Sequence, residues 1–399
     1  MTYSIAIAGC GVAGLTAALL LARQNHAVTV FEQSPQVGPV GAGVLLQPSG
    51  QMVLERLGLL HHIIPAAERI AYLRAVTHRR RALTHLPYAG AGAGLHALGV
   101  HRGALFAVLH AAALAAGVTV TLQCRVVRFV EDDRGIELFD DHSAARGRFD
   151  FLLAADGARS QLRAASSLPV SSHEYGHGVL WAQGPCAAIR GHLFQVCRGT
   201  QTLCGLLPMG HGRCTFFRSL LRDRHPSVLQ RGFDHWRNDT LALIPEAAEL
   251  LASLATFDDA RFTTYLHVHM PRWHTRRMLL LGDAAHAMSP HLGQGINLAL
   301  LDGLAIAGAI AATSTPRAAF LHYERLRRPH IRFYARVTRL LSPFFESRGV
   351  IKGWARDLAL PILPHLPWIG PQMLLTMTGL KSSALGGRMT LPEPGAPAP

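Results

Sequence analysis

The chain has 399 residues and a formal net charge of +14, and hydrophobic residues make up 49% of it. This length allows two or three domains with buried cores, and the composition excludes a disordered chain. The basic clusters, such as Arg79-Arg80-Arg81, are short and lack interleaved aromatic residues, so we expect no nucleic-acid partner. The six cysteines form no C-x-x-C pair, which favours a reduced, cytoplasmic setting.

The chain begins with a pattern of strand, glycine-rich turn and helix. Residues 4 to 8 form an apolar run typical of a buried strand, and an Ala/Leu-rich helix is expected to continue to about Arg23. In the intervening G-x-G-x-x-G, Gly9 permits the tight turn, Gly11 lets the backbone approach a pyrophosphate, and Gly14 allows close packing of helix on strand. This context predicts a dinucleotide site with the phosphates at the helix N-terminus.

The second strand is expected at residues 27 to 31 and ends at Glu32, a carboxylate suited to accept hydrogen bonds from ribose hydroxyls. Farther along, Ser49 is a candidate N-cap for a helix over residues 51 to 57, which Gly58 would end. The chain therefore starts as a β-α-β unit.

Two more segments belong to the same part of the fold. A helix is expected from Arg102 to Ala116, followed by a strand at 118 to 123, and a buried strand at 149 to 154 ends at Asp156-Gly157. An acidic residue and a glycine at the carboxyl end of a strand often mark a ligand crevice. The Gly/Ala run 89 to 94 opens no clear helix, so we predict a loop there and no second nucleotide site.

The pattern of apolar residues and glycines changes between residues 171 and 269. Short runs typical of strands, such as 213 to 220, alternate with glycine turns and predict an antiparallel sheet, with a helix-rich insert near 226 to 255. A strand at 278 to 281 then re-enters the first domain and delivers the loop Gly282-Asp283.

The expected fold is α/β, in two domains: a Rossmann-like dinucleotide-binding domain with an inserted antiparallel-sheet substrate domain and a helical C-terminus. The nucleotide domain is discontinuous, over 1–70, 98–170 and 270–330. The substrate domain takes 71–97 and 171–269, a helical cap 331–385, and a disordered Pro/Gly-rich tail 386–399.

Residues 358 to 380 carry no formal charge, but four prolines interrupt them, so short helical pieces are expected rather than a spanning helix. A cap packed over the ligand cavity is the preferred interpretation. The alternative is a shallow contact with a membrane surface, beside the basic residues Arg348, Lys352, Arg356 and Lys381.

The motifs together resemble the single-component FAD-dependent aromatic hydroxylases. These are the para-hydroxybenzoate hydroxylase-like flavoprotein monooxygenases, which include salicylate hydroxylases and ubiquinone-pathway hydroxylases. The resemblance covers about residues 4 to 330 and rests on the Gly9 fingerprint with Glu32, the Arg102 helix start, Asp156-Gly157, and the loop from Gly282-Asp283 through Pro290 to Asn297.

The resemblance implies which residues bind FAD. Asp283 accepts a ribityl hydroxyl hydrogen bond, Arg102 lies along the phosphates or the ribityl chain, and Asp156 serves both FAD and the nicotinamide donor. A plain surface arginine at 102 and a structural loop at 156 are the alternatives. The expected FAD-binding residues are Gly9, Gly11, Ala13, Gly14, Glu32, Gln33, Gly43, Arg102, Val126, Asp156, Asp283, Gly293, Gly295, Ile296 and Asn297.

The resemblance also places Pro290, Gly293, Gln294 and Gly295 beside the flavin ring, where oxygen is activated. The helix from 296 to about 311 would point its positive end at the flavin pyrimidine. His286 is expected to be packed and hydrogen-bonded rather than bound to a metal, and His291 is free to face the substrate. No catalytic base is assigned; the eligible residues are His177, His192, His211, His267, His269 and Tyr265.

The implied reaction uses NADH or NADPH to reduce FAD, and O2 then gives a flavin C4a-hydroperoxide that hydroxylates an aromatic, phenolic or quinone-like molecule. Because the chain has no second strand-to-helix G-x-G-x-x-G, the nicotinamide donor is expected to bind transiently. The alternatives are a prenyl-lipid reductase of the same fold and a flavin-binding partner without turnover. A monomer or homodimer is expected.

Overall fold

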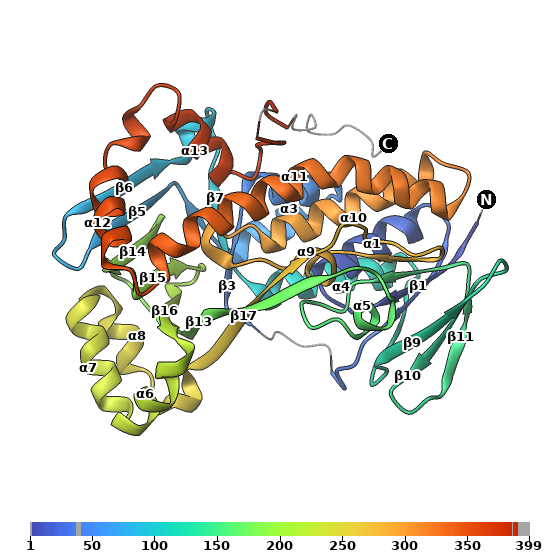
Figure 1. The fold of residues 1–399 in the computed structure, drawn as a ribbon, viewed down its shortest axis with the longest axis horizontal. Helices are drawn as coiled ribbons and strands as arrows, with labels where there is room; N and C mark the ends of the chain where they lie inside the picture. Colours follow the sequence, from blue (N-terminus) through green and yellow to red (C-terminus); the bar gives the residue numbers. More distant parts are fainter. Residues whose placement is uncertain (1, 37–40, 385, 390–399) are drawn as a thin grey trace.

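A computed structural model describes residues 2–36, 41–384 and 386–389 of the chain. Its first half is built on a five-stranded parallel sheet (Figure 1). The strands, in spatial order, are β18 (Met278–Leu280), β12 (Phe151–Ala154), β1 (Ser4–Ala8), β2 (Ala27–Phe31) and β8 (Thr119–Thr121). The expected nucleotide-binding sheet is thus confirmed, and strands from three distant segments of the chain complete it.

Helices pack against this sheet, and the three-stranded sheet described below adds Val126, Ile136 and Leu138 to the same buried core. The helices of this half are α1 (Val12–Arg23), α2 (Pro48–Arg56), α3 (Leu60–Ile63), α4 (Arg102–Ala115), α5 (Gln161–Ala165), α9 (Asp283–His286), α10 (Gly295–Ala311) and α11 (Pro316–Phe345). Helices α1 and α10 approach closely because Gly303 lies against Thr16, whose Cβ would be 2.6 Å from any added Cβ. Core residues such as Leu15 and Ile306 are fully buried between these layers.

A seven-stranded sheet forms the second half. In spatial order it contains β17 (Arg261–His269), β13 (Ser171–Pro185), β16 (Arg213–Leu221), β15 (Thr202–Pro208), β14 (His192–Arg198), β5 (Tyr72–Thr77) and β6 (Ala82–Pro87). The prediction of an antiparallel sheet over residues 171–269 is confirmed. Strand β5, from the earlier segment, extends this sheet by pairing with β14 in parallel. Strands β5 and β14 are far apart in the chain. Because no hairpin joins them, they can pair in parallel.

The long strands β13 and β17 run side by side from this sheet toward the first half (Figure 1). The β17 strand ends where Val268 donates its N–H to the carbonyl of Ala287, 2.9 Å away. A third, small sheet of β3 (Gly43–Leu46), β7 (Ala97–His101) and β4 (Ala67–Ile70) also lies between the halves. Several segments of the backbone therefore connect the two halves.

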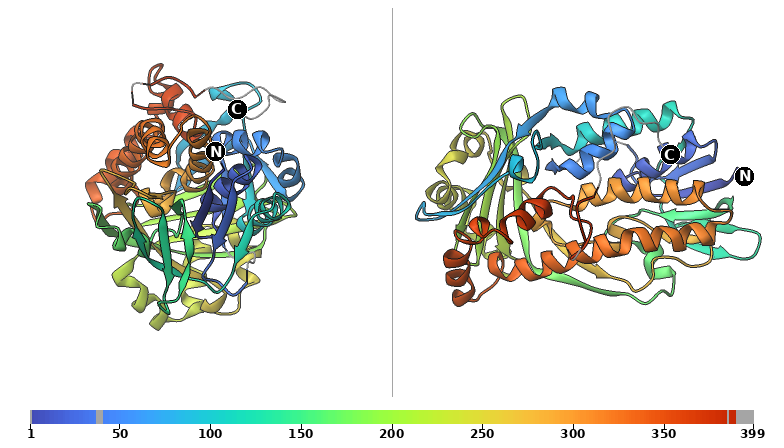
Figure 2. Two further views of the ribbon diagram at one scale, coloured as in Figure 1. Left: turned by 90° about the vertical axis from the view of Figure 1, so that its right-hand side faces the viewer. Right: turned by 90° about the horizontal axis from the view of Figure 1, so that it is seen from above.

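Helices cover the outer face of the large sheet and the end of the molecule. They are α6 (His225–Arg231), α7 (Phe233–Leu243) and α8 (Ala248–Ala252) on the sheet, and α12 (Val350–Ala359) and α13 (Gly370–Met377) after α11. Figure 2 shows α11 running the length of the molecule and crossing from one half to the other. The boundary expected at residue 330 falls inside this helix, so the C-terminal cap is not separated there.

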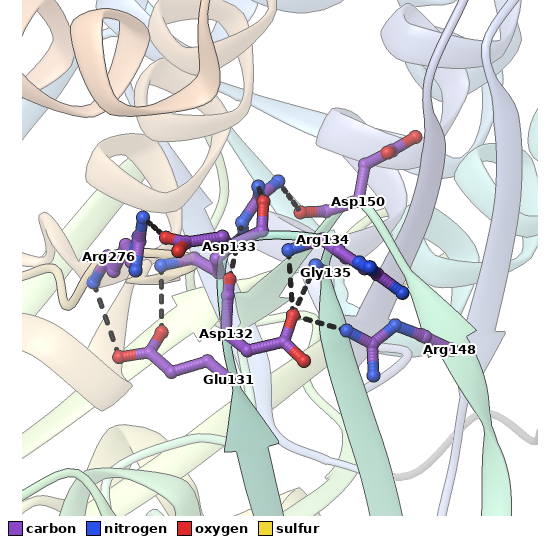
Figure 3. A network of polar contacts seen from close by, with 9 residues as sticks. Glu131, Asp132, Asp133, Arg134, Gly135, Arg148, Asp150 and Arg276 are labelled. Atoms are coloured by element: carbon purple, nitrogen blue, oxygen red, sulfur yellow. Dashed lines mark hydrogen bonds and ion pairs between the residues drawn. The ribbon is translucent and has the colours of Figure 1, made fainter.

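The remaining sheet has strands β11 (Ala145–Phe149), β10 (Ile136–Asp140) and β9 (Val126–Glu131). A polar network fastens it to the segment before β18 (Figure 3). Glu131 accepts a hydrogen bond from the backbone N–H of Arg277 at 2.8 Å. Arg277 also donates to the carbonyl of Asp150 at 2.9 Å, and Arg276 pairs with Asp133. This network fixes the place where the chain re-enters the first sheet.

Two local predictions need correction or restriction. Helix α2 begins at Pro48 with Gln47 as its N-cap residue, so Ser49 lies inside the first turn. Proline at the first helical position is favourable because its missing N–H would have no partner there. Of the tail expected to be disordered, residues 386–389 lie against the chain, where Met389 donates to the carbonyl of Leu380, and 390–399 lie outside the described residues. No helix in the described ranges has the length and apolarity to cross a bilayer.

Candidate functional site

The glycine-rich loop has the geometry that its sequence predicts. Gly9 has φ of 102°, and an added Cβ would lie 2.4 Å from the carbonyl oxygen of Ala155. At Gly14 an added Cβ would lie 2.1 Å from the carbonyl oxygen of Gly9, so strand and helix pack without room for a side chain. Gly11, the N-cap of α1, has open space around the same position. Two glycines therefore serve packing, and Gly11 leaves the helix N-terminus accessible to a phosphate.

Glu32 follows β2 and its carboxylate braces this loop. Its Oε2 accepts the N–H of Cys10 at 2.8 Å and its Oε1 accepts the N–H of Ser34 at 2.9 Å. These bonds hold the carboxylate at the end of the strand, next to the turn. A carboxylate oxygen can accept more than one hydrogen bond, so this arrangement leaves capacity for a ribose hydroxyl.

The second predicted loop touches the first. At Gly282, whose φ is 57°, an added Cβ would lie 3.1 Å from the Cβ of Ala13 in α1. Asp283, the next residue, is exposed. Two loops that are more than 260 residues apart in the chain therefore meet at the N-terminal end of α1. A single dinucleotide that contacts both loops requires this arrangement.

A buried carboxylate holds the second loop in place. Asp302 of α10 accepts the N–H of Gly282 at 3.0 Å and a hydrogen bond from His286 at 2.6 Å. Its other oxygen accepts from Nε of Arg327 at 2.7 Å. Burial acts to raise the pKa of Asp302, but the contacts with His286 and Arg327 outweigh this effect and lower it. The prediction that His286 is packed and hydrogen-bonded is confirmed, and no group of metal-ligating side chains occurs among the described residues.

The Asp156 loop is tied to the same place. Arg163 of α5 donates to the carbonyl of Ala284 and to the carbonyl of Ala158, both at 2.8 Å. Asp156 accepts the N–H of Leu162 at 3.2 Å with one oxygen, while its buried Oδ1 has no partner among the described atoms. Burial raises the pKa of this carboxyl. An unpaired buried oxygen at a strand end is what a bound hydroxyl or water would satisfy.

The loop from Pro290 ends at a helix N-terminus. Residues Pro290–Leu292 form a short helical turn, Gly293 is left-handed with φ of 60°, and α10 begins at Gly295, which is surrounded by open space. This long helix directs its free N–H groups toward that space. The start of the helix was predicted at Ile296, one residue later.

The side chains of this loop have structural partners. Asn297 donates to the carbonyls of Leu45 and Gly293 and accepts the N–H of Gln47 at 2.9 Å. Gln294 donates to the carbonyl of Met377 at 2.9 Å. The Asn297 side chain is therefore occupied in joining α10 to β3, which leaves only its backbone for a cofactor.

The other expected cofactor residues are distributed around the same loops. Arg102 begins α4 with an exposed side chain that lies beside Gly41, and Gln33 is exposed after β2. Gly43 allows β3 to approach the large sheet, where its N–H donates to Oγ1 of Thr215 at 2.6 Å. The side chain of Val126 is buried in the core at the start of β9, so only its backbone is available. Arg159, which follows the Asp156-Gly157 motif, is paired with Glu174 at 2.9 Å.

A cluster of buried polar groups lies next to Pro290, where β13, β17 and α11 meet. His291 Nδ1 contacts the hydroxyls of Ser289 and Ser342, and its Nε2 is 3.6 Å from Oε2 of Glu346. The side chains of His291 and Glu346 are each over nine-tenths buried. Burial raises the pKa of Glu346 to about 7 and lowers the pKa of His291 to about 4. His291 is thus neutral near pH 7, and Glu346 changes charge there.

Two of the six eligible bases belong to this cluster. His177 lies close enough to lower the pKa of His291, and its Nε2 is buried without a partner among the described residues. Burial and then Glu346 raise the pKa of Tyr265. His267 is nearby, with its Nδ1 3.4 Å from the hydroxyl of Tyr175.

The other three eligible residues have different surroundings. His192 stacks on Tyr72 in the large sheet, and His211 and His269 are exposed. No contact joins any of them to the cluster in the described part of the chain.

The sequence interpretation missed Glu346, Asp302, Arg163 and Arg327. One signal was available: Glu346 is the only acidic residue between Glu324 and Asp357, in a strongly basic stretch. Asp302, Arg163 and Arg327 act through tertiary contacts, and their positions in helical patterns gave no indication of that role.

Comparisons with known proteins agree with this geometry. A family model described as an FAD binding domain matches residues 2–338. Aurachin C monooxygenase/isomerase of Stigmatella aurantiaca is 29% identical over 370 residues, which are 89% of this chain and 92% of that protein. A 3-amino-4-hydroxybenzoate 2-monooxygenase of Streptomyces platensis is 30% identical over 392 residues, 91% of this chain and 93% of that protein.

The same fold occurs among solved structures. HpxO of Klebsiella pneumoniae, crystallised with FAD and uric acid, superposes with a TM-score of 0.80 at 22% identity. The superposition covers 96% of this chain and 98% of that one. The arrangement of both halves is therefore that of a known flavoprotein.

Proposed function

The chain belongs to the FAD-dependent aromatic monooxygenases of the para-hydroxybenzoate hydroxylase-like class, and from this premise we propose how its own residues divide the work. It is an enzyme that hydroxylates an aromatic compound with FAD as cofactor. We propose NADH or NADPH as the transient electron donor and a phenolic or quinone-like ring as the substrate. Neither the prenyl-lipid reductase nor the partner without turnover is favoured by these relatives.

The observation that carries the cofactor assignment is the meeting of two distant loops at one helix N-terminus. The open space beside Gly11 gives room for the pyrophosphate of FAD, and the open space beside Gly295 gives room for its flavin end. Asp283 is exposed on the loop that meets α1. Gly11 would approach the pyrophosphate, Asp283 would accept a ribityl hydroxyl, and the N-terminus of α10 would face the flavin pyrimidine. Arg102 would pair with the phosphates.

When bound, FAD supplies electron transfer and oxygen activation. The protein supplies a water-poor chamber and a fixed orientation for the ring. We assign the substrate side of this chamber to the end of β17 and the loop after Pro290, because these elements join the two halves.

We further propose His291 and Glu346 as the proton acceptor for a substrate hydroxyl. An ionised phenol is the more electron-rich ring, so removing its proton favours oxygen transfer. His291 would accept the proton at Nε2, and Glu346 would stabilise the resulting imidazolium across the 3.6 Å contact. The hydroxyls of Ser289 and Ser342 hold the other nitrogen and orient the ring.

The test is a screen of phenolic and quinoid compounds for faster oxidation of NADH or NADPH by the holoenzyme, followed by mass analysis for a gain of one oxygen. A substrate that accelerates flavin reduction and gains oxygen supports the proposal. If no compound does either, hydroxylation of these classes is rejected. We also propose a monomer or homodimer in a cytoplasmic location. Light scattering distinguishes the two assemblies, and fractionation of cells tests the location.

A further inference from the structure

The C-terminal helix α12 has its apolar side turned away from the protein. Its buried residues are Gly353 and Arg356. Gly353 lies against Thr200, and Arg356 donates to the carbonyls of Gly199 at 2.8 Å and Phe344 at 3.0 Å. A helix on a protein surface ordinarily buries its apolar stripe, so this orientation is the reverse of the usual one.

The outward side carries large apolar side chains. Ile351 is 84% exposed, Trp354 76% and Leu358 74%, and Val350 is exposed beside them. Their spacing of three, four and seven residues places them on one face of the helix. The chain that follows adds Trp368, which is 86% exposed, and Ile362. We call these six residues the C-terminal apolar face.

This face lies at the end of the molecule farthest from the N-terminus. Figure 1 shows α12 and the segment leading to α13 at the outer corner of the second half. In Figure 2 the same segment forms the tip beyond α11. No described element covers it, and each of the two tryptophans is more exposed than tryptophan usually is in a soluble protein.

Basic residues lie close to the apolar face in the chain. On α11 the exposed residues Arg336 and Arg339 lie in the last three turns and lead to exposed Leu340. On α12, Lys352 is also exposed. The carboxylates from residue 324 to residue 380 are Glu324, Glu346 and Asp357. The first two are buried, and Asp357 accepts hydrogen bonds from Arg356.

We propose that this face docks on the surface of a bilayer that contains anionic lipids. Exposed tryptophans next to aliphatic side chains and basic residues are the composition of an interfacial helix, which lies flat at the level of the headgroups. Lysine and arginine beside such a helix add attraction to anionic lipids. Two copies of the chain packed on this face would bring their basic residues near one another, whereas anionic headgroups attract those residues. This proposal is independent of the reaction assigned above.

The test is co-sedimentation of the FAD-loaded enzyme with vesicles. One set contains phosphatidylcholine alone and the other equal parts of phosphatidylcholine and phosphatidylglycerol. The wild type should bind the mixed vesicles more tightly than the neutral ones. The double variant Trp354→Ser/Leu358→Ser should lose about tenfold in partition coefficient for the mixed vesicles.

Three further variants separate the contributions. Arg336→Gln/Lys352→Gln should weaken binding to mixed vesicles by about fivefold per charge and leave binding to neutral vesicles unchanged. The matched control Leu114→Ser/Val130→Ser removes two apolar side chains, 47% and 51% exposed, from the nucleotide-binding half and should bind as the wild type does. In mixed vesicles with brominated lipids, the wild type should show quenched tryptophan emission, and Trp368→Phe should show less quenching while still binding.

Three outcomes overturn the proposal. The first is no sedimentation of the wild type with mixed vesicles, and the second is equal sedimentation of the wild type and Trp354→Ser/Leu358→Ser. The third is a wild-type dimer that the same double variant converts to a monomer without any binding to vesicles. That result would assign the face to a contact between two copies of the chain.

Discussion

Nε2 of His291 lies 3.6 Å from Oε2 of Glu346, and neither atom has a hydrogen-bond partner among the described residues. Burial disfavours both charges, raising the pKa of Glu346 to about 7 and lowering that of His291 to about 4. Between these values the pair holds a single proton, on the carboxyl group, rather than forming an ion pair. Above about pH 7 the pair is ready to accept a proton from a third group.

The first prediction concerns the pH dependence of hydroxylation. In the wild type, kcat with a phenolic substrate should rise as Glu346 ionises near pH 7. Glu346→Gln keeps the shape of the side chain but has no ionisable group, so the rise should disappear and kcat at pH 8 should fall about a hundredfold. The measurement is product formation against pH, with KM determined at each pH.

The control is Glu55→Gln, which changes an exposed carboxylate on α2. It should retain the wild-type profile. A Glu346→Gln variant whose kcat still rises through pH 7 would remove Glu346 from proton transfer.

The second prediction is that Glu346 lowers the free energy of unfolding at neutral and alkaline pH. Its folded pKa is raised from 4.5 to about 7, so the folded state holds the proton more tightly than the unfolded state does. Stability therefore falls as pH rises from about 4.5 through 7, and the loss is complete above that range. At pH 8, Glu346→Gln should be more stable than the wild type by about 1–3 kcal/mol, and at pH 4.5 nearly equal to it. Urea unfolding at the two pH values measures the difference, and equal values at pH 8 would contradict the assignment.

Much of the nucleotide half could be predicted because its signals are local. Strand β1 and helix α1 have the predicted bounds, since Gly9 and Gly14 satisfy steric demands of a single turn. The parallel pairing of β14 with β5 could not be predicted, because it joins residues over a hundred positions apart. The same reason hid Glu346, whose importance comes from His291 on another element. The outward apolar side of α12 was also hidden, because periodicity shows that a helix has an apolar side but not which side packs.

Asp283 should act on the cofactor alone. Its side chain is exposed, so Asp283→Ala leaves no buried group unpaired, and the stability of the apoprotein should change little. The loss of a charged acceptor for a ribityl hydroxyl should weaken FAD binding by about 1.5–3 kcal/mol. Equilibrium titration of the apoprotein with FAD measures this, and an unchanged dissociation constant would exclude Asp283 from the site.

Asp302, in contrast to Asp283, should be needed for the stability of the apoprotein. Asp302→Ala would leave Arg327 and His286 buried without their carboxylate and would release the N–H of Gly282. The apoprotein should therefore lose about 3–5 kcal/mol of stability. Urea unfolding of the apoprotein, compared with that of Asp283→Ala, tests the contrast. Equal stability of the two variants would show that the buried network does not hold the loop.

The final prediction separates two glycines of one motif. Gly11 has φ of −80° and open space where a Cβ would lie, so Gly11→Ala should fold with a stability within about 1 kcal/mol of the wild type. Its methyl group would occupy the space that a pyrophosphate needs, and FAD affinity should fall about tenfold or more. Gly14→Ala places a methyl group 2.1 Å from the carbonyl oxygen of Gly9 and should destabilise the apoprotein itself. Apoprotein unfolding and FAD titration on both variants check this division. If Gly11→Ala bound FAD as tightly as the wild type, the pyrophosphate would have to lie elsewhere than at the N-terminus of α1.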